Sequence, residues 1–260
     1  MTTTNLKIIG LIAMLVDHIG QFIPNTPEWF QWIGRLAAPI FIYGVVEGYH
    51  HTKDRKKYIK RIYIFSFIMS ILILIINNTF NHNGTEISNN FFAPLYIILI
   101  VISLLNSKKY KYLILWQIIA FILSVFFAQT LSNLDVLGSA RVIYLAVGSI
   151  FGSILFVEGG PLFVLLGLLF HFTRNKMGKT VIMYSLFSLL CYVAYEKIGD
   201  SYNFLYTYMA PFASYQWMML SALPLILLHN GKKGFGLKYF FYIFYPVHII
   251  VLYLIGVYLE

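Results

Sequence analysis

The chain alternates between long apolar runs and short polar segments. A helix needs roughly 20 predominantly apolar residues to cross the hydrocarbon core of a membrane, and most of these runs approach that length. The pattern therefore predicts an all-α protein, a polytopic membrane bundle of about nine or ten transmembrane helices. The predicted spans are 6–23, 29–46, 60–77, 91–105, 111–131, 141–157, 160–172, 180–195, 207–228 and 237–258.

One break in the pattern falls between the runs 141–157 and 160–172, where the sequence reads Glu-Gly-Gly-Pro at 158–161. Glycine and proline interrupt helices at membrane depth where other groups satisfy the freed backbone. The segment is therefore either a tight turn between two helices or the middle of a single discontinuous helix.

Composition places the chain in the lipid bilayer. Of 260 residues, 59% are hydrophobic and only 11% are charged, with a mean hydropathy of +0.75, which is too apolar for a soluble domain. Cys191 is the single cysteine, which excludes an intrachain disulfide and a cysteine-based metal site. We find no internal repeat and no long linker, so residues 1–260 are predicted to form one domain.

The net charge of +9 indicates topology and not a nucleic-acid partner, because the basic residues lie in the gaps between apolar runs. Cytoplasmic loops of membrane proteins accumulate Lys and Arg. If 141–172 is one crossing, most of the basic clusters fall on the side of the N-terminus. We therefore expect a cytoplasmic N-terminus and a broken or re-entrant element around Gly159.

Asp17 and His18 are adjacent in the first apolar run. Ionisable groups within the hydrocarbon are costly, so each one suggests a functional site. A carboxylate beside a histidine can fix the imidazole tautomer and raise its basicity, as a general base requires. The alternative is that Asp17 pairs with Arg35 of the second run and that His18 is a hydrogen-bonded packing residue.

The second run contains Gly34-Arg35, with Arg35 about six residues inside the boundary, followed by Pro39, which is expected to kink the helix. Arg35 is placed to hold Asp17 or an anionic group of a substrate. The run ends in Glu47, with His50 and His51 close behind, but neighbouring histidines point in different directions on a helix, so we expect no metal. The basic segment that follows is either a topology signal or a phosphate site, including one for a nucleotide-bearing cofactor. It contains Lys53, Arg55, Lys56 and Lys57.

The last run contains Tyr245-Pro246-Val247-His248. A proline and a histidine at membrane depth predict freed backbone carbonyls and a polar pocket inside the bundle. Taken alone, His248 could be structural.

Three segments, 6–20, 32–65 and 220–255, together resemble the TraX family, whose founding members acetylate the N-terminus of conjugative pilin. The middle of the chain, 66–219, matches only in its pattern of helices. The motifs that match are Asp17-His18, Gly34-Arg35 with Pro39, Val46-Glu47-Gly48 with His51-Thr52, the NGKKG turn at 230–234, and Tyr245-Pro246-x-His248.

The resemblance implies a transmembrane acyltransferase of the bacterial cell membrane that uses cytoplasmic acetyl-CoA, without a metal. The acceptor would be a peptide N-terminus or a sugar or other cell-envelope group at the membrane. His18 would be the base, Asp17 its orienting partner, Arg35 the clamp for Asp17 or the acyl oxygen, and His248 with Tyr245 a second polar wall. The donor-binding residues implied are Glu47, His51, Lys53, Arg55, Lys56, Lys57 and Tyr245.

A proton-coupled transporter or channel is the competing interpretation. Asp17, His18, Arg35 and His248 would then form an intramembrane polar path. Transporters of this kind more often carry a pair of interrupted helices in matching halves, and we find no such symmetry. The enzyme is therefore the favoured interpretation.

Overall fold

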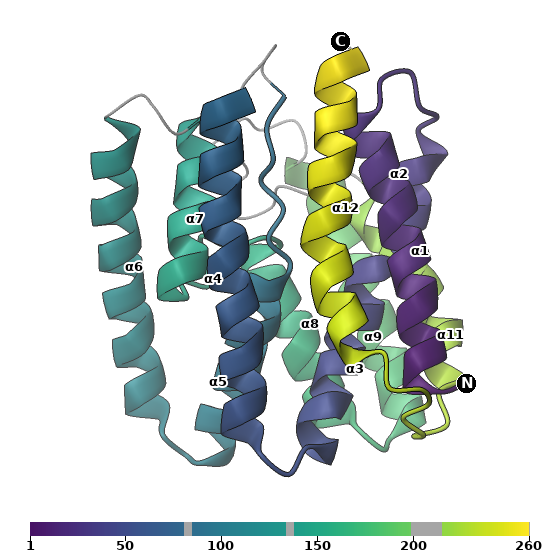
Figure 1. Ribbon diagram of the computed structural model, residues 1–260. Coiled ribbons are helices and arrows are strands. Elements are labelled where there is room, and N and C mark those ends of the chain that lie inside the picture. The colour runs from purple at the N-terminus through teal and green to yellow at the C-terminus, as the bar shows by residue number, and fades with distance from the viewer. Residues whose placement is uncertain (81–84, 134–137, 199–214, 260) are drawn as a thin grey trace. The chain divides into compact units, whose positions relative to one another are not determined.

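The computed structural model describes residues 1–80, 85–133, 138–198 and 215–259, and over these ranges the chain forms helices and turns without a strand (Figure 1). The prediction of an all-α membrane protein is confirmed. The helices are α1 (Thr3–Phe22), α2 (Trp29–Gly34), α3 (Ala37–His51), α4 (Arg55–Phe80), α5 (Phe92–Asn106), α6 (Tyr110–Ser132), α7 (Ala140–Phe151), α8 (Gly160–Thr173), α9 (Met177–Ile198), the 3₁₀ helix η1 (Gln216–Ala222), α11 (Leu223–Leu227) and α12 (Lys238–Leu259).

Within the described residues, α1, α4, α6, α9 and α12 are long and apolar enough to cross a membrane. Shorter apolar helices are α5, α7, α8 and the η1–α11 segment. Of the predicted span 207–228, residues 207–214 lie outside the described residues, and the remainder is η1 and α11.

The predicted run 141–157 is not one helix. α7 ends at Phe151, and Gly152 caps it in the left-handed conformation, with φ of 81°. At 1.5 Å per residue, α7 rises about 18 Å and α8 about 21 Å, so neither alone crosses a hydrocarbon core of about 30 Å. That α7 and α8 form the two halves of one broken crossing stays a prediction.

The predicted helix 29–46 is also divided, because α2 ends at Gly34 and α3 begins at Ala37. The expected kink at Pro39 is therefore wrong. Pro39 lies in the first turn of α3, where a missing N–H leaves no helical hydrogen bond unmade. The break places Arg35 in the turn between the two helices.

The chain divides into two compact units. The described part of unit 1 is residues 1–48, 169–198 and 215–259, and the described part of unit 2 is residues 49–80, 85–133 and 138–168. α3 and α8 each continue from one unit into the other. A single domain over residues 1–260 stays a prediction.

In unit 1, α1 and α12 pack against each other and run in the same direction (Figure 1). The turn that precedes α12 holds the start of α1, because the backbone N–H groups of Thr3 and Thr4 donate to the carbonyls of Lys232 (2.9 Å) and Lys233 (3.1 Å). Gly234 in this turn has φ of 77°, and a Cβ there would lie 2.6 Å from the Thr2 hydroxyl. The NGKKG motif thus joins the two helices at one end.

In unit 2, buried amides and hydroxyls bond mainly to the backbone. The Asn77 side chain both donates to the carbonyl of Ile87 (2.7 Å) and accepts from its N–H (2.9 Å). Asn90 donates to the carbonyl of Ser66 (2.9 Å), and Tyr96 donates to that of Ser149 (2.7 Å). These contacts satisfy polar groups that lipid could not satisfy.

The side chain of Gln117 on α6 satisfies the broken end of α7. Its amide nitrogen donates to the carbonyl of Gly152 (3.0 Å), and its amide oxygen accepts from the N–H of Ile154 (2.9 Å). Non-helical backbone at membrane depth is tolerated where protein groups complete its hydrogen bonds.

Candidate active site

His18 of α1 and His248 of α12 form a hydrogen-bonded pair inside unit 1. The Nδ1 atom of His18 lies 2.7 Å from the Nε2 atom of His248, and the two rings stack with centroids 4.9 Å apart. Their exposed fractions are 4% and 6%. Two residues separated by 230 positions therefore meet in the interior of the bundle.

The hydrogen bonds of His248 determine the tautomers of both rings. The Nδ1 atom of His248 lies 2.7 Å from the carbonyl oxygen of Phe244, which can only accept, so Nδ1 carries the proton. In a neutral ring, Nε2 of His248 is then the acceptor, and Nδ1 of His18 must donate to it. This leaves the lone pair of His18 on Nε2.

Aromatic side chains surround this pair. Phe244 stacks on His248 at 4.7 Å between centroids, and the Tyr245 ring meets the edges of both imidazoles. Phe22, one turn beyond His18, has its centroid 6.2 Å from that ring. The apolar wall keeps water from competing for the hydrogen bonds of the histidines and so strengthens them.

Asp17 pairs with Arg35 at 3.5 Å, while His248 makes the hydrogen bond to His18 that the sequence assigned to Asp17. Arg35 also donates through Nε to the carbonyl of Gln31 (3.1 Å). A Cβ at Gly34 would lie 2.1 Å from the Asp17 carboxylate, so only glycine lets α2 approach Asp17 this closely. Asp17 therefore makes the ion pair with Arg35 that was the alternative, and an orienting role for Asp17 stays a prediction.

A second group of polar side chains lies in unit 1, at the end of the bundle where α1 begins. Glu47 of α3 is buried and accepts from the guanidinium of Arg174 at 2.9 and 3.4 Å. Tyr43, one turn before Glu47, interacts electrostatically with both charges. A carboxylate held in this way is a poor ligand for a phosphate. The geometry therefore does not support a contact between Glu47 and the phosphates of acetyl-CoA.

His229 extends this group. Its Nδ1 atom lies 3.0 Å from the Tyr43 hydroxyl, and its Nε2 atom lies 2.9 Å from the Thr3 hydroxyl. Because the Thr3 hydroxyl donates to the carbonyl of Lys232, it accepts from Nε2 of His229, which leaves Nδ1 to accept from Tyr43. Both ring nitrogens are engaged. We call Thr3, Tyr43, Glu47, Arg174 and His229 the Glu47 cluster.

The basic residues proposed for the donor lie in unit 2, at the start of α4. Asp54 caps this helix by accepting from the N–H of Lys57 (2.9 Å). Arg55 stacks on the Tyr49 ring at 4.8 Å, and Lys56 lines a pocket. The exposed side chains are His51, Lys53, Arg55, Lys56 and Lys57.

The residues proposed to bind the acetyl donor thus belong to two different units of the structure. Tyr245 lies against the histidine pair and Glu47 against Arg174, both in unit 1, whereas the basic segment belongs to unit 2. No group of three His, Cys, Asp or Glu side chains within the described ranges is placed to hold a metal ion.

Sequence reasoning missed Tyr43, Arg174 and His229. Arg174 lies in a basic segment and His229 lies directly before the NGKKG turn, and neither carries a signal of its own in the sequence. The one available signal was the spacing of Tyr43 and Glu47, four residues apart on one helical face.

A family described as "TraX protein" matches residues 2–256. The chain belongs to the TraX family. The match includes the middle of this TraX chain, which the motifs alone did not cover. The chain is 26% identical over 262 residues to "Probable fimbrial assembly protein FimC, serogroup H1" of Dichelobacter nodosus, and the alignment covers 95% of this chain and 92% of that protein. No solved structure matches.

Family membership and the five helices of membrane-spanning length together make this TraX-family chain a multi-pass bacterial membrane protein.

Proposed function

We propose that this TraX-family protein is a membrane-embedded acetyltransferase that moves an acetyl group from acetyl-CoA to an acceptor at the membrane. The observation that carries the proposal is the chain of contacts from the Phe244 carbonyl through His248 to His18. It holds one imidazole in a defined tautomer, with the basic nitrogen on the side away from its partner. A general base requires this arrangement.

The proposed reaction is direct transfer. Nε2 of His18 takes a proton from the acceptor amine or hydroxyl as that group attacks the thioester carbonyl of acetyl-CoA. The new C–N or C–O bond forms, the C–S bond breaks, and the CoA thiolate leaves with a proton returned by the His18 imidazolium. While His18 is charged, its Nδ1–H donates to His248, and the resulting polarisation is passed on to the Phe244 carbonyl.

Arg35, in the turn between α2 and α3, and Asp17, next to His18 on α1, support this site. Their ion pair fixes the turn between α2 and α3 against the same turn of α1 that carries His18. In the proposal, Arg35 keeps one further role, which is to stabilise negative charge on the acyl oxygen in the transition state.

The basic segment at the start of α4 is the proposed contact for the phosphates of the donor. Lys53, Arg55, Lys56 and Lys57 are exposed there, and ammonium and guanidinium groups complement phosphate charge. This assignment requires the N-terminus to be cytoplasmic, where acetyl-CoA is available. We expect His51 beside this segment to take part.

The preferred acceptor is a peptide N-terminus, because the relative in Dichelobacter nodosus is named as a fimbrial assembly protein. A sugar hydroxyl of the cell envelope is the second acceptor class.

The contact geometry favours an enzyme over a proton-coupled transporter. A proton path needs groups that can both take up and release a proton at each step. The chain through His18 and His248 ends at the Phe244 carbonyl, which accepts a hydrogen bond but has no proton to release.

The test is acetyl transfer by the purified full-length protein in liposomes, with acetyl-CoA and a peptide that has a free N-terminal amine. The same peptide with a blocked N-terminus is the control substrate. N-acetylated peptide and free CoA in equal amounts are the expected products. Folded wild-type protein that neither binds acetyl-CoA nor modifies an amine or sugar acceptor would overturn the proposal.

A further inference from the structure

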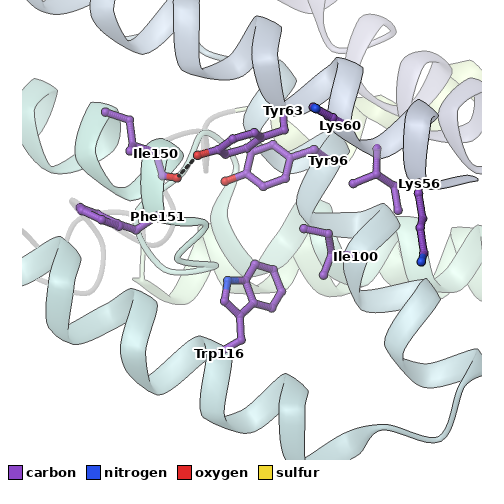
Figure 2. Close-up of a pocket in the computed structure, with 9 residues that line it drawn as sticks. Lys56, Lys60, Tyr63, Tyr96, Ile100, Trp116, Ile150 and Phe151 are labelled. Carbon is purple, nitrogen blue, oxygen red and sulfur yellow. Dashed lines mark hydrogen bonds between the residues drawn. The ribbon is translucent and has the colours of Figure 1, made fainter.

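Unit 2 contains a pocket of about 480 Å³ between α4, α5, α6 and α7. Two lysines of α4 stand at one side of it, and the remaining wall is aromatic and aliphatic (Figure 2). The lining residues are Lys56, Ile59, Lys60, Tyr63, Tyr96, Ile100, Trp116, Ile150 and Phe151.

The pocket lies at the end of α7. α7 rises only about 18 Å and ends at Phe151. Ile150 and Phe151, its last two residues, line this space. Empty space at membrane depth sacrifices dispersion contacts on every wall, so an apolar occupant is favoured.

The two tyrosine hydroxyls of the inner wall are already engaged. The Tyr63 hydroxyl donates to the carbonyl of Ile150 (3.2 Å), as Figure 2 shows, and the Tyr96 hydroxyl donates to that of Ser149 (2.7 Å). Trp116 on α6 presents its ring to the pocket. A nucleotide base would find few partners for its amino and ring nitrogens here, whereas a hydrocarbon chain needs none.

The rim of the pocket is basic, in contrast to its apolar inner wall. Lys56 and Lys60 are four residues apart, so their side chains leave the same face of α4 one turn apart. Both are exposed, and both belong to the pocket. Paired lysines between transmembrane helices attract anionic lipid headgroups at a membrane surface.

We propose that this pocket binds an anionic phospholipid, with the phosphate on Lys56 and Lys60 and an acyl chain against Tyr63, Trp116 and the end of α7. The site is separate from the proposed chemistry of the histidine pair, which belongs to unit 1. It does not depend on the acetyltransferase proposal, although it shares Lys56 with the basic segment that we propose for the phosphates of acetyl-CoA.

The experiment is native mass spectrometry of the full-length protein released from detergent after incubation with phosphatidylglycerol or phosphatidylcholine. Wild type is expected to retain phosphatidylglycerol preferentially. The Lys56→Gln, Lys60→Gln variant should lose about 30-fold in that preference, since each lysine near a membrane surface contributes roughly one kcal/mol. The matched control is Lys53→Gln, Lys57→Gln, which removes the same charge from the same segment outside the pocket and should retain the preference.

A further variant tests the binding of the acyl chain of the lipid rather than that of its headgroup charge. Ile100→Trp fills the pocket and leaves both lysines intact, so retention of both lipids should fall while the melting temperature is maintained. Equal lipid retention by the two double variants would overturn the proposal. Weaker acetyl-CoA binding by Ile100→Trp with unchanged lipid retention would also overturn it, because the pocket would then be part of the acetyl-CoA site.

Discussion

Unit 1 holds two groups of polar side chains, and they differ in how many of their histidine ring nitrogens take part in hydrogen bonds. In the Glu47 cluster, both nitrogens of His229 are engaged, and the carboxylate is held by the Arg174 guanidinium. In the pair of His18 and His248, the hydrogen bonds engage Nδ1 of His18 and leave the lone pair of His18 on Nε2. The first arrangement stabilises the fold, and the second leaves a lone pair available for chemistry.

The comparison teaches that burial of an ionisable side chain does not by itself identify a reactive group. His18, Glu47 and His248 are all buried. The hydrogen bonds of the histidine pair engage Nδ1 of His18 and leave its lone pair on Nε2, whereas those of the Glu47 cluster engage both nitrogens of His229. Substitutions in the two groups should therefore affect different measurements.

The largest effect is expected from His18→Ala. Loss of a general base lowers acetyl transfer by about 10² to 10⁴-fold, measured as peptide acetylation per folded molecule. The melting temperature should also fall, because the truncation leaves a cavity and an unpaired acceptor on His248, so the rate is compared per folded molecule. His50→Ala is the control histidine and should stay active. Retained transfer by His18→Ala would remove His18 from the mechanism.

Arg174→Met leaves the Glu47 carboxylate buried without its ion-pair partner. We expect a loss of about 3 kcal/mol in the free energy of unfolding, near the lower end for a broken buried pair because Arg174 is partly exposed. The double variant Glu47→Leu, Arg174→Met should recover most of that loss. Denaturant titration of the purified protein measures both. A double variant as unstable as the single one would show that the pair is not the source of the effect.

His248→Leu removes the acceptor for the Nδ1–H group of His18. Acetyl transfer should fall by about tenfold to a hundredfold, as when the hydrogen-bond partner of a functional histidine is lost. His248→Gln, whose amide oxygen reaches near the original Nε2 position, should restore part of the rate. A packing role alone predicts no difference in rate between Leu and Gln variants of equal stability.

The smallest effect on transfer is expected from His229→Phe. Loss of its two hydrogen bonds should lower the free energy of unfolding by about 1 to 2 kcal/mol. Acetylation per folded molecule should remain within about twofold of wild type, in line with the usual independence of separated sites. A large fall in transfer at unchanged stability would erase the distinction between the two groups.

The sequence predicted the membrane class and the position of most helices, because apolar periodicity and length decide them. It placed α1 and α12 to within a few residues. It missed the division of the second run at Arg35, because this turn is too short to interrupt the apolar run. It also extended α7 to residue 157, where the left-handed cap at Gly152 ends the helix at Phe151.

The candidate site was predictable only as a set of residues. His18 and His248 were singled out because each is an ionisable group in an apolar run. Their pairing was not readable, since a contact between residues 230 positions apart depends on how α1 and α12 pack. The same limit applies to Glu47, because its ion-pair partner Arg174 lies 127 positions away along the chain.

The joining of His18 to His248 also has a consequence for biogenesis. Membrane helices enter the bilayer in the order of their synthesis, so α1 resides there long before α12 is made. Throughout that interval, His18 has no imidazole partner to set its tautomer. In the proposed mechanism, a chain interrupted before α12 would lack His248, and acetyl transfer would reach its full rate only once α12 is in place.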